Sequence, residues 1–242
     1  MARIVSKEEL AGAERFGNFV KIDSETIVKS GQSDHLAEAE TMKFIAARTT
    51  IPVPKMYDTY TDEGESGLVC IVMEFIPGEN LSVAWDAYSD AEKESVIQQL
   101  RGYVGQLREI KGDFIGSVDG SWCNDHYFDN DRGGYEPFVY EVELNQGIVK
   151  ALKTMQPYDW VNFTCDIIPE VMTGRGAVMT HSDFDPRNIL LSGCYPEYWE
   201  YYKAMRWPGW ETEWVRDRAL ENILKPYRKE LSVVWNTVEI IW

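Results

Sequence analysis

The first third of the chain is marked by short runs in which apolar residues gather or alternate with polar ones. The four runs cover residues 19–22, 26–29, 55–60 and 68–75. Such runs, bounded by turn residues, are typical of β-strands, and polar stretches between them predict hairpin turns. Between the two strand pairs, residues 36–48 carry apolar side chains at helical spacing. The pattern therefore predicts two strand pairs with one helix between them.

The pattern becomes helical after Pro77-Gly78, which breaks the last strand. Ser89 and Glu92 have the spacing of a capping box at the start of a long helix. The apolar stripe expected on that helix is Val96, Leu100, Tyr103 and Leu107. Further helices are predicted over residues 137–153, 160–172, 196–205 and 210–231. This order predicts an α+β protein with a small β-rich lobe at residues 1–76 and a mainly helical lobe at residues 77–242.

Residues 178–191 hold the most informative motif of the chain. Two apolar, strand-like segments flank His181, Asp183 and Asn188 in the spacing H-x-D-x-x-x-x-N. This is the spacing of a kinase catalytic loop, where the Asp accepts the proton of a substrate hydroxyl and the Asn holds magnesium. His, Asp and Asn are also common loop residues, and Asp183 could simply cap a turn.

Composition narrows the classes of partner. The formal net charge is −16, and 44% of the 242 residues are hydrophobic, which is typical of a packed globular protein. An acidic surface repels phosphate backbones, so nucleic-acid binding is not expected, whereas a cationic small molecule would be tolerated. The four cysteines form no C-x-x-C pair, and the longest apolar run is too short to cross a bilayer. We therefore expect a cytoplasmic protein with free thiols and no membrane partner, whose oligomeric state the sequence leaves open.

Several ordered segments resemble the aminoglycoside phosphotransferase family, which has a bilobal, protein-kinase-like fold. The segments that carry the resemblance are Thr26–Gly31, Ala37–Glu40, Ile51–Tyr57, Ile71–Gly78 and Thr180–Asp183. The run Tyr195–Tyr201 looks like the fungal members of that family. By eye the resemblance extends from about residue 17 to residue 232.

The resemblance implies a set of site residues. Lys29 would contact the phosphates of ATP with Glu38 holding it in place, and the backbone of Glu74, Phe75 and Ile76 would meet the adenine. In the other lobe, Asp183 would be the general base, Asn188 a magnesium ligand and His181 a brace for the loop. Arg187 lies next to this site without an assigned role, and Gly17-Asn18 would be at most a reduced phosphate-covering turn.

One departure from the family pattern concerns the metal. Kinases of this type need a second metal-binding Asp after the Asn, yet no acidic residue lies between Asn188 and Glu197. Magnesium favours carboxylates and phosphate oxygens, so Asn188 alone would hold it weakly or not at all. Glu197 is a poor substitute, because it is predicted to start a helix.

Three interpretations follow. The first is an ATP- and Mg²⁺-dependent phosphotransferase for a small hydroxylated or amine-bearing molecule, impaired by the missing Asp. The second is a non-catalytic pseudokinase that binds nucleotide or a protein partner. The third is a gene-model error after Leu191, which sequencing of the transcript would reveal. The acidic loop with Asp125, Asp129 and Asp131 would suit a cationic substrate, although such loops are usually only solvated.

Overall fold

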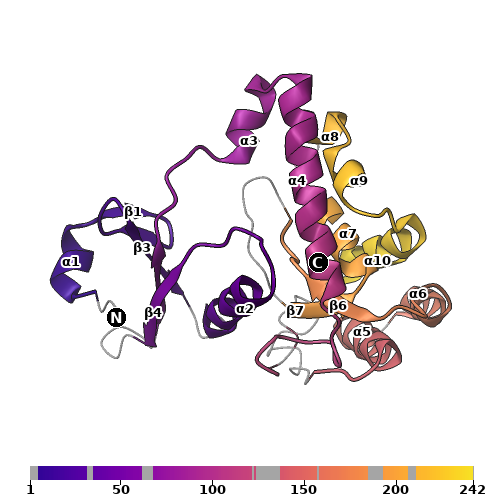
Figure 1. Ribbon diagram of the computed structural model, residues 1–242. Helices are drawn as coiled ribbons and strands as arrows, with labels where there is room; N and C mark the ends of the chain where they lie inside the picture. Colours follow the sequence, from indigo (N-terminus) through magenta and orange to yellow (C-terminus); the bar gives the residue numbers. More distant parts are fainter. Residues whose placement is uncertain are drawn as a thin grey trace. The chain divides into compact units, whose positions relative to one another are not determined.

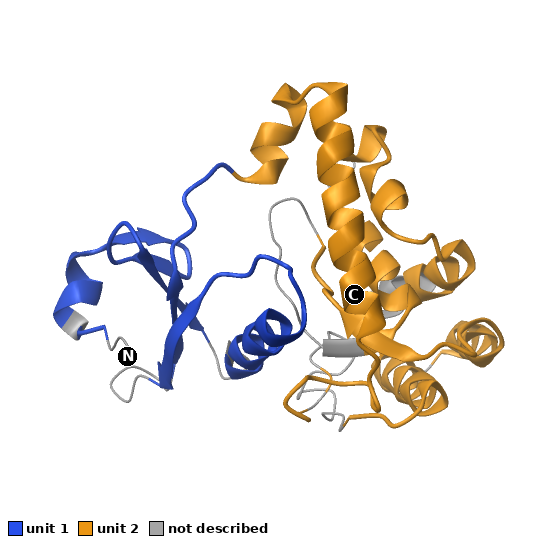
Figure 2. Cartoon of the chain, viewed as in Figure 1, with its two compact units in different colours: residues 1–79 blue, residues 80–242 orange. Residues whose placement is uncertain are grey.

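The computed structural model describes residues 5–31, 35–61, 68–121, 123, 137–156, 158–184, 193–206 and 211–241. The chain forms two compact units, Met1–Glu79 and Asn80–Trp242, which are coloured separately in Figure 2. Each unit has its own buried core, so each is described by itself.

The first unit is built on one antiparallel sheet (Figure 1). Its strands are β1 (Glu14–Phe16), β2 (Phe19–Lys21), β3 (Thr26–Gly31), β4 (Met56–Thr61) and β5 (Val69–Glu74). Their order across the sheet is β1-β2-β3-β5-β4. The two helices of this unit are α1 (Lys7–Gly12) and α2 (His35–Arg48). The two predicted strand pairs and the helix between them are thereby confirmed.

Branched apolar side chains hold this sheet together. Val20, Val28 and Val72 come from three neighbouring strands and form a buried cluster with Val5 and Cys70. Branched side chains pack well on a pleated surface, which explains why these segments form strands. The turn from β1 to β2 contains Gly17 at φ 57°, a left-handed backbone conformation that glycine adopts without steric cost.

Helix α2 covers part of the sheet with one apolar face. Ala39, Met42 and Ile45 are buried, and the helix packs against β4 and β5. The helix ends at Arg48, before the Pro52 and Pro54 that cannot continue it. The opposite, polar face carries the exposed ion pair Lys43–Glu40, whose charged atoms lie 2.8 Å apart.

The second unit is mainly helical. Its elements are α3 (Leu81–Ala84), η1 (Trp85–Ala87), α4 (Asp90–Glu109), α5 (Glu141–Met155), α6 (Asp159–Val171), β6 (Ala177–Thr180), β7 (Gly193–Pro196), α7 (Tyr198–Arg206), α8 (Glu213–Arg216), α9 (Ala219–Ile223) and α10 (Arg228–Ile241). The capping box predicted at Ser89 and Glu92 is present at the start of α4. Among the described residues, no helix is both long and apolar enough to cross a membrane.

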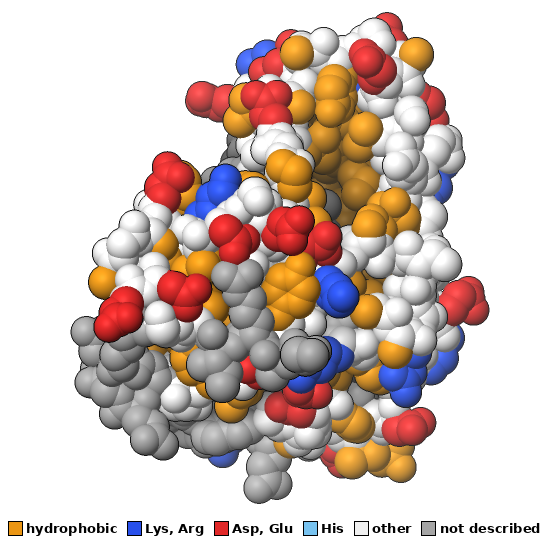
Figure 3. Space-filling model, turned by 60° about the vertical axis from the view of Figure 1, so that its left-hand side comes forward, with side chains coloured by type: hydrophobic (Ala, Val, Ile, Leu, Met, Phe, Trp, Pro, Cys, Tyr) orange, Lys and Arg blue, Asp and Glu red, His pale blue; other side chains and the backbone are white. Residues whose placement is uncertain are grey.

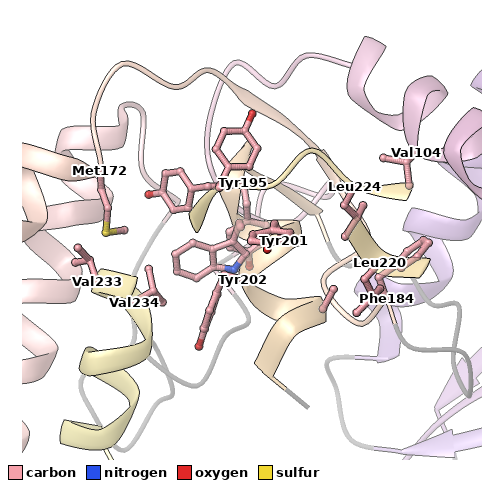
Figure 4. Close-up of a cluster of buried hydrophobic side chains, with 14 of the residues drawn as sticks. Val104, Met172, Phe184, Tyr195, Tyr201, Tyr202, Leu220, Leu224, Val233 and Val234 are labelled. Atoms are coloured by element: carbon pink, nitrogen blue, oxygen red, sulfur yellow. The ribbon is translucent and has the colours of Figure 1, made fainter. Parts of the chain in front are cut away.

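Aromatic side chains from strand β7 and helix α7 fill the core of the second unit. Tyr195, Tyr198, Trp199, Tyr201 and Tyr202 are all buried. The Trp199 ring stacks on Tyr195 at 5.5 Å and meets Tyr202 edge-on at the same centroid distance. In Figure 4, side chains from the end of α6, from β7 and α7 and from α9 and α10 converge on one cluster. These aromatic side chains therefore pack the core of the second unit.

Three predicted helix features are corrected. The buried face of α4 is Ile97, Leu100, Val104 and Leu107, whereas Val96 and Tyr103 are only partly buried. The helix predicted from residue 196 begins at Tyr198, because Pro196 ends strand β7. The segment predicted as one helix over 210–231 is divided into α8, α9 and the start of α10. A left-handed residue, Arg218 at φ 54°, separates the first two, and Pro226 precedes the third.

Candidate active site

The first unit contains a buried ion pair between β3 and α2. Lys29 Nζ lies 2.6 Å from Glu38 Oε2 and 2.9 Å from Oε1, and both side chains are largely buried. The Phe19 ring lies 5.7 Å from the same ammonium. A buried ammonium fixed by a carboxylate is a preorganised positive charge, which suits an anionic ligand. Glu40, on the exposed face of the same helix, pairs with Lys43 instead.

The predicted adenine linker begins where β5 ends. Phe75 N–H donates to Glu25 O at 2.9 Å, so that amide is already committed within the sheet. The Glu74 carboxylate accepts Lys55 N–H at 3.1 Å. Ile76 is 58% exposed. The backbone of this linker is therefore anchored at Glu74 and Phe75, while Ile76 projects to solvent.

In the second unit, the candidate general base, Asp183, lies in the turn that follows strand β6. His181 and Phe184 are buried and their rings meet edge-on at 5.5 Å, whereas Asp183 between them is exposed. His181 Nδ1 accepts the Asp183 backbone N–H at 3.2 Å. Ser182 has φ 62°, a conformation that is uncommon for a residue with a side chain. This turn exposes Asp183 to solvent between two buried residues.

A residue that sequence reasoning missed supports this turn. Glu200, on α7, is only 1% exposed and accepts the backbone N–H groups of His181 at 2.5 Å and Ser182 at 3.1 Å. Burial raises the pKa of Glu200, although the nearby Arg108 charge and the two amides act in the opposite direction. The sequence offered one signal for this role, an acidic residue within a run of aromatic residues. A carboxylate buried among aromatic side chains needs specific hydrogen-bond partners.

Two predicted site residues, Arg187 and Asn188, lie outside the described residues, as do Asp125, Asp129 and Asp131 of the acidic loop. The structure thus joins Lys29 with Glu38 in one unit and His181 with Asp183 in the other.

The register of the β6–β7 hairpin shows that Glu197 lies at the far end of the hairpin from His181. Thr180 pairs with Gly193 at the end next to His181, and Ala177 pairs with Pro196 at the other end. Glu197 follows Pro196, so it lies about 13 Å along the strand from the loop end. Its carboxylate also accepts the Tyr227 hydroxyl at 2.6 Å. Over the described ranges, no group of three or more His, Cys, Asp or Glu side chains could hold a metal ion. The described residues therefore do not fit a carboxylate-rich magnesium site.

The Tyr227–Glu197 hydrogen bond predicts a pH-dependent loss of stability. This bond holds the pKa of Glu197 below its ordinary value of 4.5. A lowered pKa stabilises the folded state above the unfolded pKa, and that contribution disappears as the pH falls through the folded pKa. Tyr227→Phe is expected to lower the free energy of unfolding by about 1–3 kcal/mol at neutral pH, and by less at about pH 3. Urea unfolding at both pH values measures this, with the exposed Tyr158→Phe as control. A pH-independent loss would contradict it.

Comparisons with known proteins give the following likenesses. A family model described as "Phosphotransferase enzyme family" matches residues 20–198. A search of curated proteins finds no significant match. Among solved structures, the GDP complex of wild-type aminoglycoside 2'-phosphotransferase-IIIa aligns with 94% of this chain and 82% of its own, with a TM-score of 0.59 at 11% identity. The streptomycin-ATP-APH(2")-IIa ternary complex aligns with 94% of this chain and 83% of its own, with a TM-score of 0.57 at 15% identity. Aminoglycoside-3'-phosphotransferase of type VIII aligns with 93% of this chain and 88% of its own, with a TM-score of 0.54 at 15% identity. The likenesses confirm the predicted α+β, kinase-like fold.

Proposed function

Because the chain belongs to the phosphotransferase enzyme family, we propose that it binds ATP and transfers the terminal phosphoryl group slowly to a small hydroxylated or amine-bearing molecule. The observation that carries the proposal is the buried Lys29–Glu38 ion pair. A fixed ammonium neutralises phosphate charge that shifts during transfer. Glu38 keeps the ammonium in place. The backbone of the linker Glu74, Phe75 and Ile76 would meet the adenine through groups other than the Glu74 and Phe75 amides, which donate to Lys55 and Glu25.

The second half of the proposal concerns Asp183. This carboxylate is exposed on a turn whose two flanking residues, His181 and Phe184, are buried. A general base must be held within reach of the hydroxyl proton that it accepts, and such a turn does this. His181 braces the loop rather than exchanging protons, because its Nδ1 accepts the Asp183 amide. Arg187, four positions after Asp183 in the sequence, completes the proposed set of site residues.

The metal ligands are the reason that slow transfer is proposed. When bound, Mg²⁺ would supply positive charge that neutralises the phosphates. Asn188 is the residue proposed to contact it, and a single amide oxygen is a weak ligand for so hard a cation. The sequence has no acidic residue between Asn188 and Glu197, and Glu197 is bound to Tyr227 at the far end of the hairpin.

The substrate class follows from charge. Acidic side chains are spread over the face shown in Figure 3, and the net charge is −16. A cationic, amine-bearing substrate would be attracted to such a surface. APH(2")-IIa has been captured with gentamicin and with streptomycin and ATP, which supports a small polar acceptor for this chain. We propose a cytoplasmic location, where Cys70, Cys123 and Cys165, which form no disulfide with one another, would stay reduced.

A direct assay tests the proposal. The purified chain is incubated with Mg-ATP and a panel of small hydroxylated and amine-bearing compounds, and phosphorylated products are measured by mass spectrometry. Slow product formation that requires both magnesium and ATP is expected. No product with any compound, together with ATP binding that does not require magnesium, would favour a second candidate, a nucleotide-binding pseudokinase. The incomplete metal set is the observation that favours this candidate.

Lys29 provides the binding test. ATP at about a hundredfold excess over its dissociation constant stabilises a protein by about 2.7 kcal/mol, which raises the melting temperature. Lys29→Met is expected to remove this ATP-dependent shift. Lys43→Met is the matched control, because Lys43 also pairs with a glutamate of α2 but on the exposed face. An undiminished shift in Lys29→Met, or an equal loss in both variants, would contradict the assignment.

A further inference from the structure

Glu200 is an unusual residue for the place that it occupies. It lies in the first turn of α7 among core aromatics, with 1% of its surface exposed. A carboxylate in such surroundings is unfavourable unless hydrogen-bond donors surround it. Its two oxygens are each used: one accepts the His181 N–H at 2.5 Å and the other the Ser182 N–H at 3.1 Å. The Glu200 side chain therefore accepts hydrogen bonds from two consecutive backbone amides, and we call this contact the clasp.

This two-point contact depends on where the chain leaves strand β6. In an extended strand, consecutive N–H groups point to opposite sides, so one carboxylate cannot reach both. The Cα of His181 lies between the two amides, so the chain must leave the extended conformation at His181, directly after β6. Ser182, with φ 62°, then turns the chain toward Asp183. Residues other than glycine seldom adopt a positive φ, and they keep it where surrounding contacts hold the backbone. Glu200 supplies such a contact.

The turn at Ser182 then sets the position of Asp183. The Asp183 amide donates to His181 Nδ1 at 3.2 Å, and the following Phe184 is buried against the His181 ring. Asp183 thus follows two residues that are bonded to Glu200 and precedes a residue that packs on the His181 ring. Arg108 lies nearby and donates to Thr180 Oγ1 at 3.4 Å and to Glu197 O at 3.1 Å, which adds a compensating positive charge.

We infer that Glu200 is the positioning residue of the candidate general base: by clasping the amides of His181 and Ser182, it fixes the turn that presents Asp183. The part of this inference that concerns the reaction rests on the proposed function. The clasp itself is a property of the second unit and is testable without nucleotide or substrate.

Hydrogen exchange of the full-length protein tests the clasp. Glutamine in place of Glu200 keeps the shape but offers one acceptor oxygen and an NH₂ group, so one backbone donor would face another donor. In Glu200→Gln, the amides of His181 and Ser182 are expected to exchange about tenfold faster or more. Glu197→Gln is the matched control, because it removes a carboxylate bound to Tyr227 at the other end of the same hairpin. Its exchange at residues 181 and 182 should equal that of the wild type.

Kinetics test the positioning role. Glu200→Gln is expected to lower kcat for phosphoryl transfer by about tenfold or more, with little change in KM for ATP, because Lys29 and Glu38 of the other unit are intact. Glu200→Asp keeps the charge on a shorter side chain and is expected to retain part of both properties. It also replaces Glu200→Gln if that variant fails to fold.

The outcomes separate the two proposals. Unchanged exchange at residues 181 and 182 in Glu200→Gln, or equal acceleration in Glu197→Gln, would overturn the clasp. Accelerated exchange with wild-type kcat would overturn the positioning role. A wild-type protein that transfers no phosphoryl group would refute the proposed function and the catalytic role of Glu200 together, while the exchange data would still decide the clasp.

Discussion

Asp183→Asn is expected to lower kcat for phosphoryl transfer by about a hundredfold to ten-thousandfold, the range that general acid–base catalysis contributes. Asparagine has nearly the same shape as aspartate but cannot accept the proton of the acceptor hydroxyl. The side chain is exposed, so its replacement should leave the fold intact. ATP-dependent thermal stabilisation should persist, because the proposed phosphate contact, Lys29, belongs to the other unit. Product formation and melting temperature, measured on the same preparation, test both halves of the expectation.

The control for this experiment is Asp166→Asn. Asp166 is an exposed aspartate on α6 of the same unit, so its replacement changes the net charge equally. Transfer by this variant should match that of the wild type. If Asp183→Asn transfers as fast as Asp166→Asn, Asp183 is not the base.

Trp199→Ala is expected to lower the free energy of unfolding by about 3–5 kcal/mol, as truncation of a buried aromatic side chain does. The Trp199 side chain is fully buried between the rings of Tyr195 and Tyr202. Its removal would leave a cavity where β7 and α7 meet, in addition to the lost apolar burial. Urea unfolding followed by far-ultraviolet circular dichroism measures the change.

Trp160→Ala provides the comparison for the core variant. Trp160 is 53% exposed on α6, and exposed side chains contribute little to stability, so a change within about 0.5 kcal/mol is expected. Similar losses in the two variants would show that the aromatic cluster does not stabilise the second unit in the way described.

The sequence predicts the first unit well because short-range patterns determine it. Val20, Val28 and Val72 lie in runs of strand-forming residues, and polar turns separate those runs. Strand β1 was not predicted, because its three residues are all exposed and show no alternation. In the second unit, the segment 210–231 has helix-forming composition throughout, yet it is interrupted at Arg218, whose left-handed backbone no local pattern announces.

The candidate site divides in the same way. Asp183 and its neighbours could be identified because their spacing is local, and Lys29 and Glu38 because they lie in segments that resemble the aminoglycoside phosphotransferase family. Glu200 was missed because its partners are backbone amides 18 and 19 residues away in sequence. Backbone donors leave no trace in side-chain identity, so only the fold reveals such a contact.

The aromatic core of this unit is built on strand β7 and helix α7, and none of the core side chains there belongs to the proposed set of site residues. Foldedness and chemical competence are therefore separable properties of this architecture. A gene that lost one of the proposed catalytic side chains would still encode a folded product, and natural selection could retain that product for what it binds after losing what it catalyses.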